Sequence, residues 1–307
     1  MFNKKTIREI DLTGKRVLLR ADYNVPVQAG VIKDDYRMKQ SLPTIKYILG
    51  QPGASLVIIS HLGRPKNADN QSVSLAPVAK QLSQLLQMPV QFAPDCIGEA
   101  AKKAASDLKA GEVLVMENLR YHPEEEKNDE AFAKSITEAA GAEIFVQDGF
   151  GVVHRAHAST DSIARLLPAV AGLLLEKEVD AIAKVMKDPA RPLVAVVGGA
   201  KINDKIGILN RLIELADCVA IGGAMTNNFL LAEGIKVGSS LVEPEAIDTA
   251  RDILEKVRQI QQNKPFNFIV PVDVVVSKDK EGKAPTRIVD VASHTIADIQ
   301  SYPKVPA

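Results

Sequence analysis

Arginine, histidine, aspartate and asparagine side chains follow four apolar, strand-like runs in the first half of the chain. These runs and the polar segments after them occupy residues 16–27, 55–67, 112–129 and 144–160. In an open α/β sheet, ligands bind beyond the carboxyl ends of the strands. The guanidinium group of arginine presents a planar fork of donors that suits phosphate or carboxylate. The sequence therefore predicts one shared, electropositive cleft for a small anionic substrate.

Five candidate binding residues lie in the first two segments or between them. Asp22 and Asn24 lie in ADYNVPV, where they would either fix a substrate hydroxyl or carboxylate or form an Asx turn that ends the strand. Arg37 precedes a helical pattern, and a lone arginine there is commonly a solvated surface residue. His61 and Arg64 lie in SHLGRP, directly after the apolar run LVII. A histidine and an arginine together at a strand end favour a binding role over a simple turn.

The next two segments add two more arginines. Arg120 lies in ENLRYHPEEEKND, and the acidic run at 124–126 is interpreted as the solvated start of a helix, where the helix dipole favours negative charge. Arg155 lies between His154 and His157. The HxxH spacing has no nearby acidic or cysteine partner, which argues against a metal site.

Glycine pairs and lysines follow two strand-like runs in the second half. The segment VAVVGGAKINDK (194–205) holds Lys201 and Lys205, and IGGAM repeats the glycine pair with Gly222 and Gly223. The first segment is neither a Walker A motif nor GxGxxG. Glycines permit close backbone approach, the following helix offers free N–H groups to phosphate, and lysines four apart would share one helical face. Two such strand ends favour nucleotide binding.

Strand-like and helix-like segments alternate along the chain, which predicts βαβ units and parallel sheets. The intervening residues 166–192 are either an interdomain helix or an ordinary sheet-packing helix. In the first half, helical spacing occurs at 41–51, 75–87 and 129–141. In the second half, strands are expected at 192–201, 218–225 and 266–276, with helices near 205–216, 228–234 and 245–262. The expected units are a domain at 1–168, an interdomain helix or linker at 169–190, and a domain at 191–307.

Composition limits the classes of partner. The 307 residues include 38 Lys+Arg and 38 Asp+Glu, so no net field attracts nucleic acid or an anionic membrane. Aromatic residues make up 4%, which argues against a base-stacking surface. The two cysteines form no CxxC pattern, and no stretch of membrane-spanning length lacks charges. We expect a soluble cytoplasmic protein without nucleic-acid or membrane partners.

Six motifs in order resemble the phosphoglycerate kinase family across essentially the whole chain. They are DxNVP, SHLGRP, ENLRxxxxEExND, DxFGxxHRAHAST, GGAKxxDK and IGGxMxNxFL. The resemblance implies two Rossmann-like parallel-sheet domains joined by an interdomain helix. It further implies a monomer that transfers a phosphoryl group between 1,3-bisphosphoglycerate and ADP, giving 3-phosphoglycerate and ATP in glycolysis, with Mg²⁺ accompanying the nucleotide.

The resemblance also assigns residues to roles. The N-terminal domain would bind the phosphoglycerate through Asp22, Asn24, Arg37, His61, Arg64, Arg120 and Arg155. The C-terminal domain would bind ADP or ATP through Lys201, Lys205, Gly222 and Gly223. Arg37 and Lys201 are the catalytic candidates, since they would stabilise charge on the transferred phosphoryl group.

One departure from the family concerns the end of the sequence. Family members carry a GGGD[ST] segment that cradles nucleotide phosphates and helps hold Mg²⁺, and no GGGD occurs here. We therefore expect a second domain that is C-terminally incomplete, and we assign no metal ligand. An alternative is a catalytically inactive, truncated form that only binds phosphoglycerate. A dinucleotide-dependent oxidoreductase is a third hypothesis, against which the missing GxGxxG counts.

Overall fold

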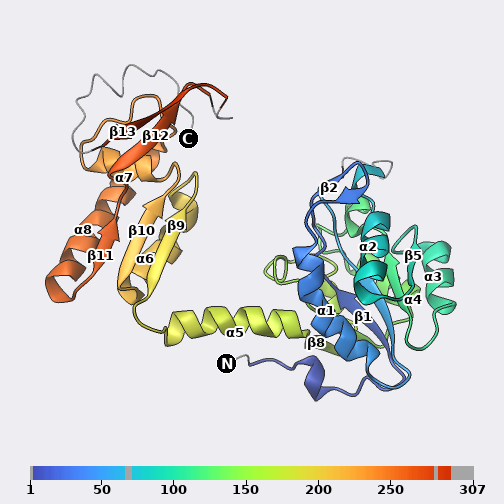
Figure 1. The fold of residues 1–307 in the computed structure, drawn as a ribbon. Helices are drawn as coiled ribbons and strands as arrows, with labels where there is room; N and C mark the ends of the chain where they lie inside the picture. The colour runs from blue at the N-terminus through green and yellow to red at the C-terminus, as the bar shows by residue number, and fades with distance from the viewer. Residues whose placement is uncertain (1–2, 66–70, 280–282, 292–307) are drawn as a thin grey trace. The chain divides into compact units, whose positions relative to one another are not determined.

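The computed structural model describes residues 3–65, 71–279 and 283–291. The chain divides into two compact units, Met1–Lys184 and Val185–Ala307, each built on a parallel sheet with helices (Figure 1). The predicted α/β class with parallel sheets is therefore confirmed. Within the described residues, no helix is both long enough and apolar enough to cross a membrane.

A six-stranded parallel sheet forms the centre of the first unit. Its strand order is β5-β6-β4-β1-β7-β8. The strands are β1 (Arg16–Arg20), β4 (Ser55–Ile59), β5 (Val90–Ala93), β6 (Val113–Met116), β7 (Ile144–Gln147) and β8 (Ala169–Ala171). The four apolar runs of the sequence correspond to β1, β4, β6 and β7. These four strands are adjacent in the sheet, in the order β6-β4-β1-β7. Because the strands are parallel, their carboxyl ends meet at one edge of the sheet.

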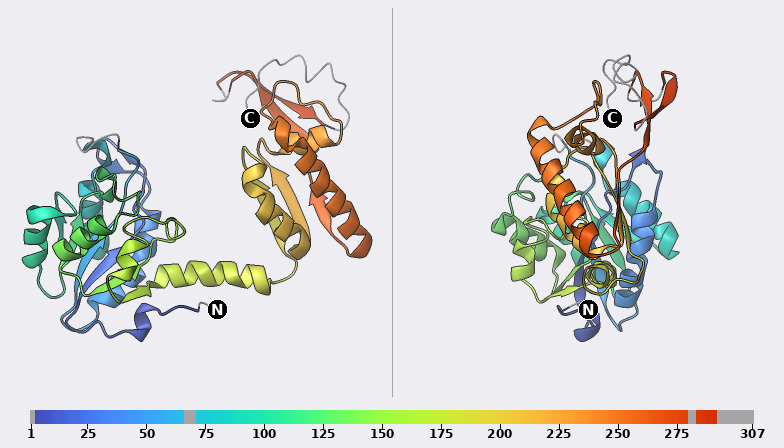
Figure 2. Two further views of the ribbon diagram at one scale, coloured as in Figure 1. Left: turned by 180° about the vertical axis from the view of Figure 1, so that it is seen from behind. Right: turned by 90° about the vertical axis from the view of Figure 1, so that its left-hand side faces the viewer.

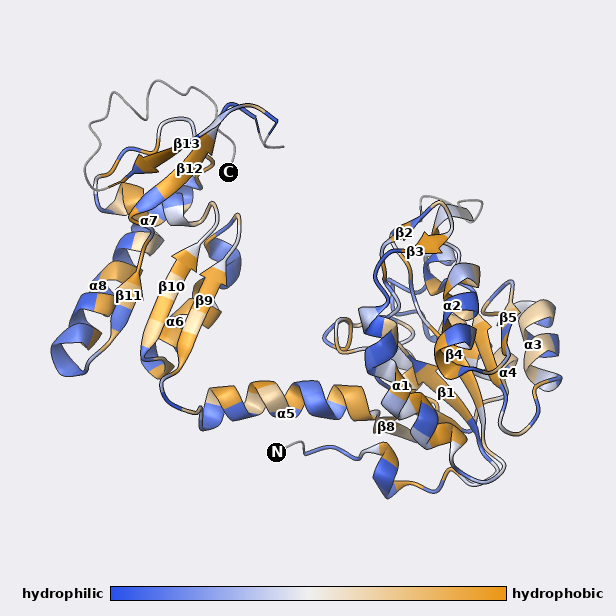
Figure 3. Ribbon diagram, viewed as in Figure 1, coloured by the Kyte–Doolittle hydropathy of each residue, from blue (hydrophilic) through white to orange (hydrophobic). Residues whose placement is uncertain are grey.

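Helices cover both faces of this sheet (Figures 1 and 2). Successive residues of β1 point to opposite faces: Val17 packs in one buried cluster with Ile45, and Leu18 packs in another with Ile136. The helices are α1 (Tyr36–Leu49) and α2 (Ala76–Leu86) on one face, and α3 (Gly98–Ser106) and α4 (Glu130–Ala140) on the other. Figure 3 shows that hydrophobic strands lie between helices that carry both hydrophobic and hydrophilic residues. Of these helices, α3 was not expected from the sequence.

Short elements complete the first unit. A hairpin of two short strands lies between β1 and α1, and single turns of 3-10 helix lie in the connections. These elements are β2 (Val27–Gln28), β3 (Val31–Ile32), η1 (Ile7–Glu9), η2 (Gln71–Val73), η3 (Leu119–Tyr121) and η4 (Ser162–Arg165).

Helix α5 (Leu173–Lys187) follows β8 and continues across the boundary between the two units. Its first turn is tied to the sheet, because Asp148, directly after β7, accepts hydrogen bonds from Leu174 N (2.9 Å) and Leu175 N (3.2 Å). Leu173 N donates to Thr44 Oγ1 of α1 at 3.0 Å. The start of α5 is therefore anchored to the same strand edge that carries the basic loops.

The second unit contains a three-stranded parallel sheet in the order β11-β10-β9. One face packs against α6 and α8, which share a buried cluster with Val197 and Val219, and the other face exposes Val196 to 79%. Figure 2 shows α6 and α8 beside this sheet. The elements are β9 (Val194–Gly198), η5 (Asn203–Lys205), α6 (Ile206–Leu215), β10 (Cys218–Gly222), α7 (Thr226–Ala232), η6 (Pro244–Ala246), α8 (Ile247–Asn263) and β11 (Asn267–Ile269).

The prediction of one strand over residues 266–276 is wrong. The segment contains β11 and then β12 (Asp273–Ser277), which leaves the parallel sheet and pairs antiparallel with β13 (Thr286–Asp290). Pro271 lies between the two strands. Proline cannot donate a ladder hydrogen bond, so it interrupts an otherwise continuous apolar run.

Candidate functional site

The seven residues assigned to the acidic substrate all line one cavity of about 260 Å³ in the first unit. They are Asp22, Asn24, Arg37, His61, Arg64, Arg120 and Arg155, and Gly63, Gly151 and Val152 complete the lining. Six of the seven follow β1, β4, β6 or β7, and Arg37 is the second residue of α1. The adjacency of these strands in the sheet is what brings residues so distant in sequence to one place. Four arginines face a single aspartate, so the cavity attracts anions.

Asp22 and Asn24 organise the first wall of this cavity. Asp22 pairs with Arg37, whose Nη1 donates to Oδ2. Asp22 Oδ1 accepts from Asn24 N at 3.2 Å, which is the Asx-turn contact considered above. Asn24 Oδ1 accepts from Gly63 N at 2.9 Å and so joins the loops after β1 and β4. A side chain at Gly151 would collide with Asp22 Oδ2 and would therefore displace the Asp22 carboxylate from its present position.

Arg120 is the most constrained of the arginines, with a side chain that is only 8% exposed. Its Nη1 donates to Gly63 O at 2.8 Å, and its Nε lies 3.1 Å from Glu126 Oε1. Burial lowers the pKa of Arg120, while Glu126 acts in the opposite direction. Arg64 and Arg155 are exposed. One guanidinium group is thus held in place, and two others are free to close on a ligand.

His61 is buried beside these cations, with only 3% of its surface exposed. Burial, followed by the charges of Arg20, Arg120 and Arg37, lowers the pKa of His61 to about 2. The ring is therefore neutral at ordinary pH. It contributes hydrogen bonding to the cavity rather than charge.

The two glycine pairs of the second unit pack against each other, backbone on backbone. Gly223 has φ +70, and a Cβ there would lie 2.8 Å from both N and O of Gly199. A Cβ on Gly198 would lie 3.5 Å from Gly222 O. A side chain at Gly223 would therefore displace the loop after β9, whereas a Cβ at Gly198 would make only an ordinary van der Waals contact.

The two candidate lysines do not share an α-helix, contrary to the spacing argument. Lys201 is exposed in the bend after β9, Lys205 ends η5, and α6 begins only at Ile206. The chain needs these residues to turn from the strand into the helix. The side chain of Lys205 lies against Gly199, where its Cε would be 3.1 Å from a Cβ. Lys205 therefore lies over the first glycine pair.

The family model described as Phosphoglycerate kinase matches residues 7–302. The chain belongs to the phosphoglycerate kinase family. Among curated relatives, the phosphoglycerate kinase of Pelotomaculum thermopropionicum is 48% identical over 274 residues, covering 89% of this chain and 68% of the relative. That of Roseiflexus sp. is 47% identical over 290 residues, covering 94% and 72% respectively.

Solved structures of the family share the fold. The phosphoglycerate kinase of Coxiella burnetii is 34% identical with a TM-score of 0.75, covering 95% of this chain and 72% of that one. The Pyrococcus horikoshii enzyme is 29% identical with a TM-score of 0.77, covering 98% and 74%. The likeness spans both units of the chain, which supports the two-domain Rossmann-like fold expected from the motifs.

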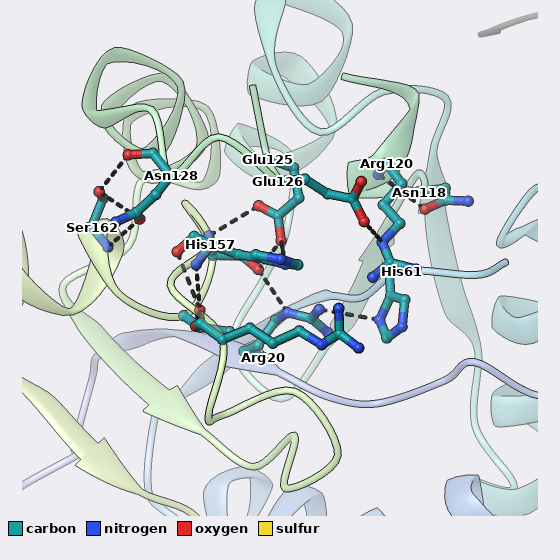
Figure 4. A network of polar contacts seen from close by, with 12 residues as sticks. Arg20, His61, Asn118, Arg120, Glu125, Glu126, Asn128, His157 and Ser162 are labelled. Atoms are coloured by element: carbon teal, nitrogen blue, oxygen red, sulfur yellow. Dashed lines mark hydrogen bonds and ion pairs between the residues drawn. The ribbon is translucent and has the colours of Figure 1, made fainter. Parts of the chain in front are cut away.

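A buried network that contacts His61 of the cavity was not predicted from the sequence (Figure 4). Arg20, 1% exposed, donates through Nε to Ser159 Oγ at 2.8 Å. Ser159 in turn donates from Oγ (2.6 Å) and N (3.0 Å) to the fully buried Glu125. His157 Nδ1 lies 3.8 Å from Glu125 Oε1. An arginine inside an apolar strand run was the available signal, because such residues are rarely buried without partners.

The network also corrects the interpretation of the acidic run at 124–126. Residues 123–128 form turns, and α4 begins at Glu130 with Asp129 as its N-cap. Glu125 is an internal acceptor instead of part of a solvated helix start, since it satisfies the donors of Ser159.

A second buried carboxylate organises the loop that carries Lys201. Glu243, 8% exposed, accepts from Ile202 N at 2.6 Å, and its own backbone carbonyl accepts from Asn228 Nδ2 at 2.6 Å. These contacts hold the loop after β9 to α7 and to the segment before η6. The sequence offered no signal for Glu243.

One group of metal-ligand atom types occurs among the described residues: Asp95, Cys96 and His122, whose ligand atoms lie within 4.8 Å of one another. None of the three lines the basic cavity. His122 Nε2 is already hydrogen-bonded to Asp95 Oδ1 at 2.8 Å, and burial raises the pKa of the Cys96 thiol. Mg²⁺ prefers oxygen ligands. This group therefore does not fit the Mg²⁺ that the family implies.

Proposed function

We propose that the chain acts as a phosphoglycerate kinase that holds the phosphoglycerate in the basic cavity of its first unit. The observation that carries this proposal is the convergence of four arginines, a neutral histidine, Asp22 and Asn24 on one cavity, in a chain of this family. Phosphate and carboxylate are the anions that such guanidinium forks recognise.

The contacts suggest a division of roles inside the cavity. Arg120 is fixed by Gly63 and Glu126 and provides a pre-oriented donor. Arg64 and Arg155 are solvated, so they can fold onto the phosphate when it enters. Asp22 is the acceptor in the cavity for a substrate hydroxyl, because carboxylate oxygens accept hydrogen bonds.

The reaction requires positive charge and correct positioning of the substrates, and it does not require a general base. In the direction that consumes ATP, the attacking carboxylate is already ionised at neutral pH. Phosphoryl transfer then requires in-line alignment and positive charge around the transferred oxygens. We assign that charge to Arg37, exposed at the start of α1, and to Lys201, exposed after β9. Lys205, Gly222 and Gly223 form the rest of the proposed nucleotide contacts.

Mg²⁺ enters this proposal with the nucleotide, where it would neutralise charge on the phosphates. We place the protein in the cytoplasm as a monomer. Two thiols outside any CxxC pattern suit a reducing compartment, and the monomer follows from the resemblance alone.

Two measurements on the purified full chain test the function. Calorimetric titration with 3-phosphoglycerate should show binding that Arg155→Gln weakens roughly tenfold, as loss of one charge-assisted contact implies. Arg165→Gln is the matched control, because Arg165 is an exposed arginine of the same unit outside the cavity. No binding by the unaltered chain would overturn the site.

The second measurement is ATP formation from 1,3-bisphosphoglycerate and ADP in the presence of Mg²⁺. Turnover is expected. Binding of 3-phosphoglycerate without any ATP formation would instead favour the phosphoglycerate-binding protein considered above.

A further inference from the structure

Arg20 makes three contacts that leave its guanidinium group no freedom. It is the last residue of β1, and its buried side chain points toward His61 (Figure 4). Nε donates to Ser159 Oγ at 2.8 Å, Nη1 donates to the carbonyl of Ala21, and Nη2 lies 3.1 Å from His61 Nδ1.

The contact with His61 determines where the imidazole proton resides. A guanidinium group can donate hydrogen bonds but cannot accept them. His61 Nδ1 must therefore be the acceptor, with its lone pair directed at Arg20 Nη2. In a neutral imidazole only one nitrogen carries a proton, and the hydrogen bond made by one nitrogen sets the state of the other. The proton of His61 is consequently on Nε2.

We propose that Arg20 is a positioning residue that holds His61 as the neutral Nε2–H tautomer, so that the ring donates a hydrogen bond to the anion in the cavity. His61 lines that cavity. The assignment of the anion as phosphoglycerate rests on the proposed function, whereas the tautomer is a property of the free protein.

Burial and the neighbouring positive charges both oppose protonation of His61. Burial is the largest cause of the lowered pKa of His61, and the cations around the ring add to it. The charged or titratable groups that face the ring are Arg20, Arg37, Arg120 and His157, with Asp22 and Glu125 near Arg20. A free histidine changes charge between about pH 5 and pH 8, and His61 does not. Its hydrogen bond to the ligand is therefore constant over that range.

The opposite side of Arg20 explains why an arginine is needed. Ser159 Oγ donates its proton to Glu125 Oε1 at 2.6 Å, so its lone pairs are available to Arg20 Nε. Arg20 therefore bridges Ser159 and His61 with two different nitrogens of one planar group. A lysine has a single nitrogen and cannot hold both acceptors in this geometry.

The first test is an NMR measurement on the unaltered chain labelled with ¹⁵N-histidine. Long-range ¹H–¹⁵N correlation separates protonated from unprotonated ring nitrogens, and the spectrum of His61→Gln identifies the His61 signals. We expect an unprotonated Nδ1 and a protonated Nε2 that do not change between about pH 5 and pH 8. A protonated Nδ1, or a ring that titrates within this range, would overturn the proposal without any ligand being present.

The second test compares Arg20→Met with Arg16→Met. Arg16 lies at the other end of β1 and contacts Ser55 and Leu108 rather than the cavity, so it controls for general loss of an arginine from the strand. In Arg20→Met the His61 ring should become a mixture of the two neutral tautomers, because burial and the remaining cations Arg37 and Arg120 still oppose its protonation. In Arg16→Met its spectrum should be unchanged.

Ligand binding gives the final readout. We expect the affinity of Arg20→Met for 3-phosphoglycerate to fall roughly tenfold and that of Arg16→Met to be unchanged. An Arg20→Met chain that binds 3-phosphoglycerate as tightly as the unaltered chain would contradict the positioning role. Failure of the unaltered chain to bind 3-phosphoglycerate would refute the proposed function alone, because the NMR result does not depend on it.

Discussion

Replacement of Asp148 by asparagine should change how the stability of the first unit depends on pH. Asp148 follows β7, is 1% exposed, and caps the first turn of α5 through Leu174 and Leu175. Its Oδ2 has no hydrogen-bond partner. Burial raises the pKa of Asp148 to about 6, although the Thr44 hydroxyl and the two backbone N–H groups act in the opposite direction. The carboxyl group is therefore easier to bury with its proton than without it.

The sign and size of the effect follow from this pKa. Below the ordinary value of 3.8, the group is protonated in both the folded and the unfolded chain, and its contribution to stability is complete. As the pH rises towards about 6, the unfolded chain loses the proton first, so the folded chain loses stability. The difference between the two pKa values corresponds to about 3 kcal/mol, since each tenfold change in an equilibrium is worth about 1.4 kcal/mol. Above about pH 6 the loss is complete.

Urea unfolding of the unaltered chain and of Asp148→Asn at several pH values measures the contribution of Asp148 to the free energy of unfolding. Asparagine has the same shape and does not titrate, so the difference in free energy of unfolding between the two proteins should shift by about 2.5 kcal/mol in favour of the variant from pH 4 to pH 7. Groups that titrate equally in both proteins cancel in the difference. A difference that does not change with pH would show that Asp148 has an ordinary pKa, and the account of the buried cap would then be wrong.

Three further perturbations test the buried network, the glycine contact and the catalytic assignment. Glu125→Ala should lower the free energy of unfolding in urea by about 3 kcal/mol, because it leaves buried donors without an acceptor; a loss below about 1 kcal/mol would contradict the network. Gly223→Ala should destabilise the second unit in thermal unfolding by about 2 kcal/mol through its positive φ and its contact with backbone, whereas Gly207→Ala, in α6 with no atom near its Cβ, should stabilise it by about 0.5 kcal/mol. Equal effects would refute the contact. Arg37→Ala and Lys201→Ala should each reduce turnover in the ATP-formation assay about 100- to 1000-fold with a smaller effect on substrate affinity, and unchanged turnover in either would remove its catalytic assignment.

The fold was predictable where one pattern dominates a segment. The apolar runs of β1, β4, β6 and β7 and the alternation with helices were sufficient to predict a parallel sheet, and the order of those four strands then brought their loops together. The pattern was not sufficient at residues 266–276, where one apolar run contains two strands of different sheets. There the local effect of Pro271 decides the path of the chain, and the average hydrophobicity of the run does not show it.

In the candidate site, the residues that line the cavity were predictable from the sequence, and the buried residues that support them were not. Arg64, Arg120 and Arg155 follow recognisable strand ends, so their types and positions in the sequence indicated a shared anion site. Glu125 is one of three consecutive glutamates, and only its contact with Ser159, which lies 34 residues away in the sequence, distinguishes it from its neighbours. Long-range pairing of this kind is decided by tertiary structure, and a single sequence does not contain it. Yet the supporting charge is a requirement of the site, because a buried arginine such as Arg20 needs a buried acceptor nearby. A cavity with several cations at its surface and a histidine beneath them should therefore be expected to have a hidden carboxylate in the layer below.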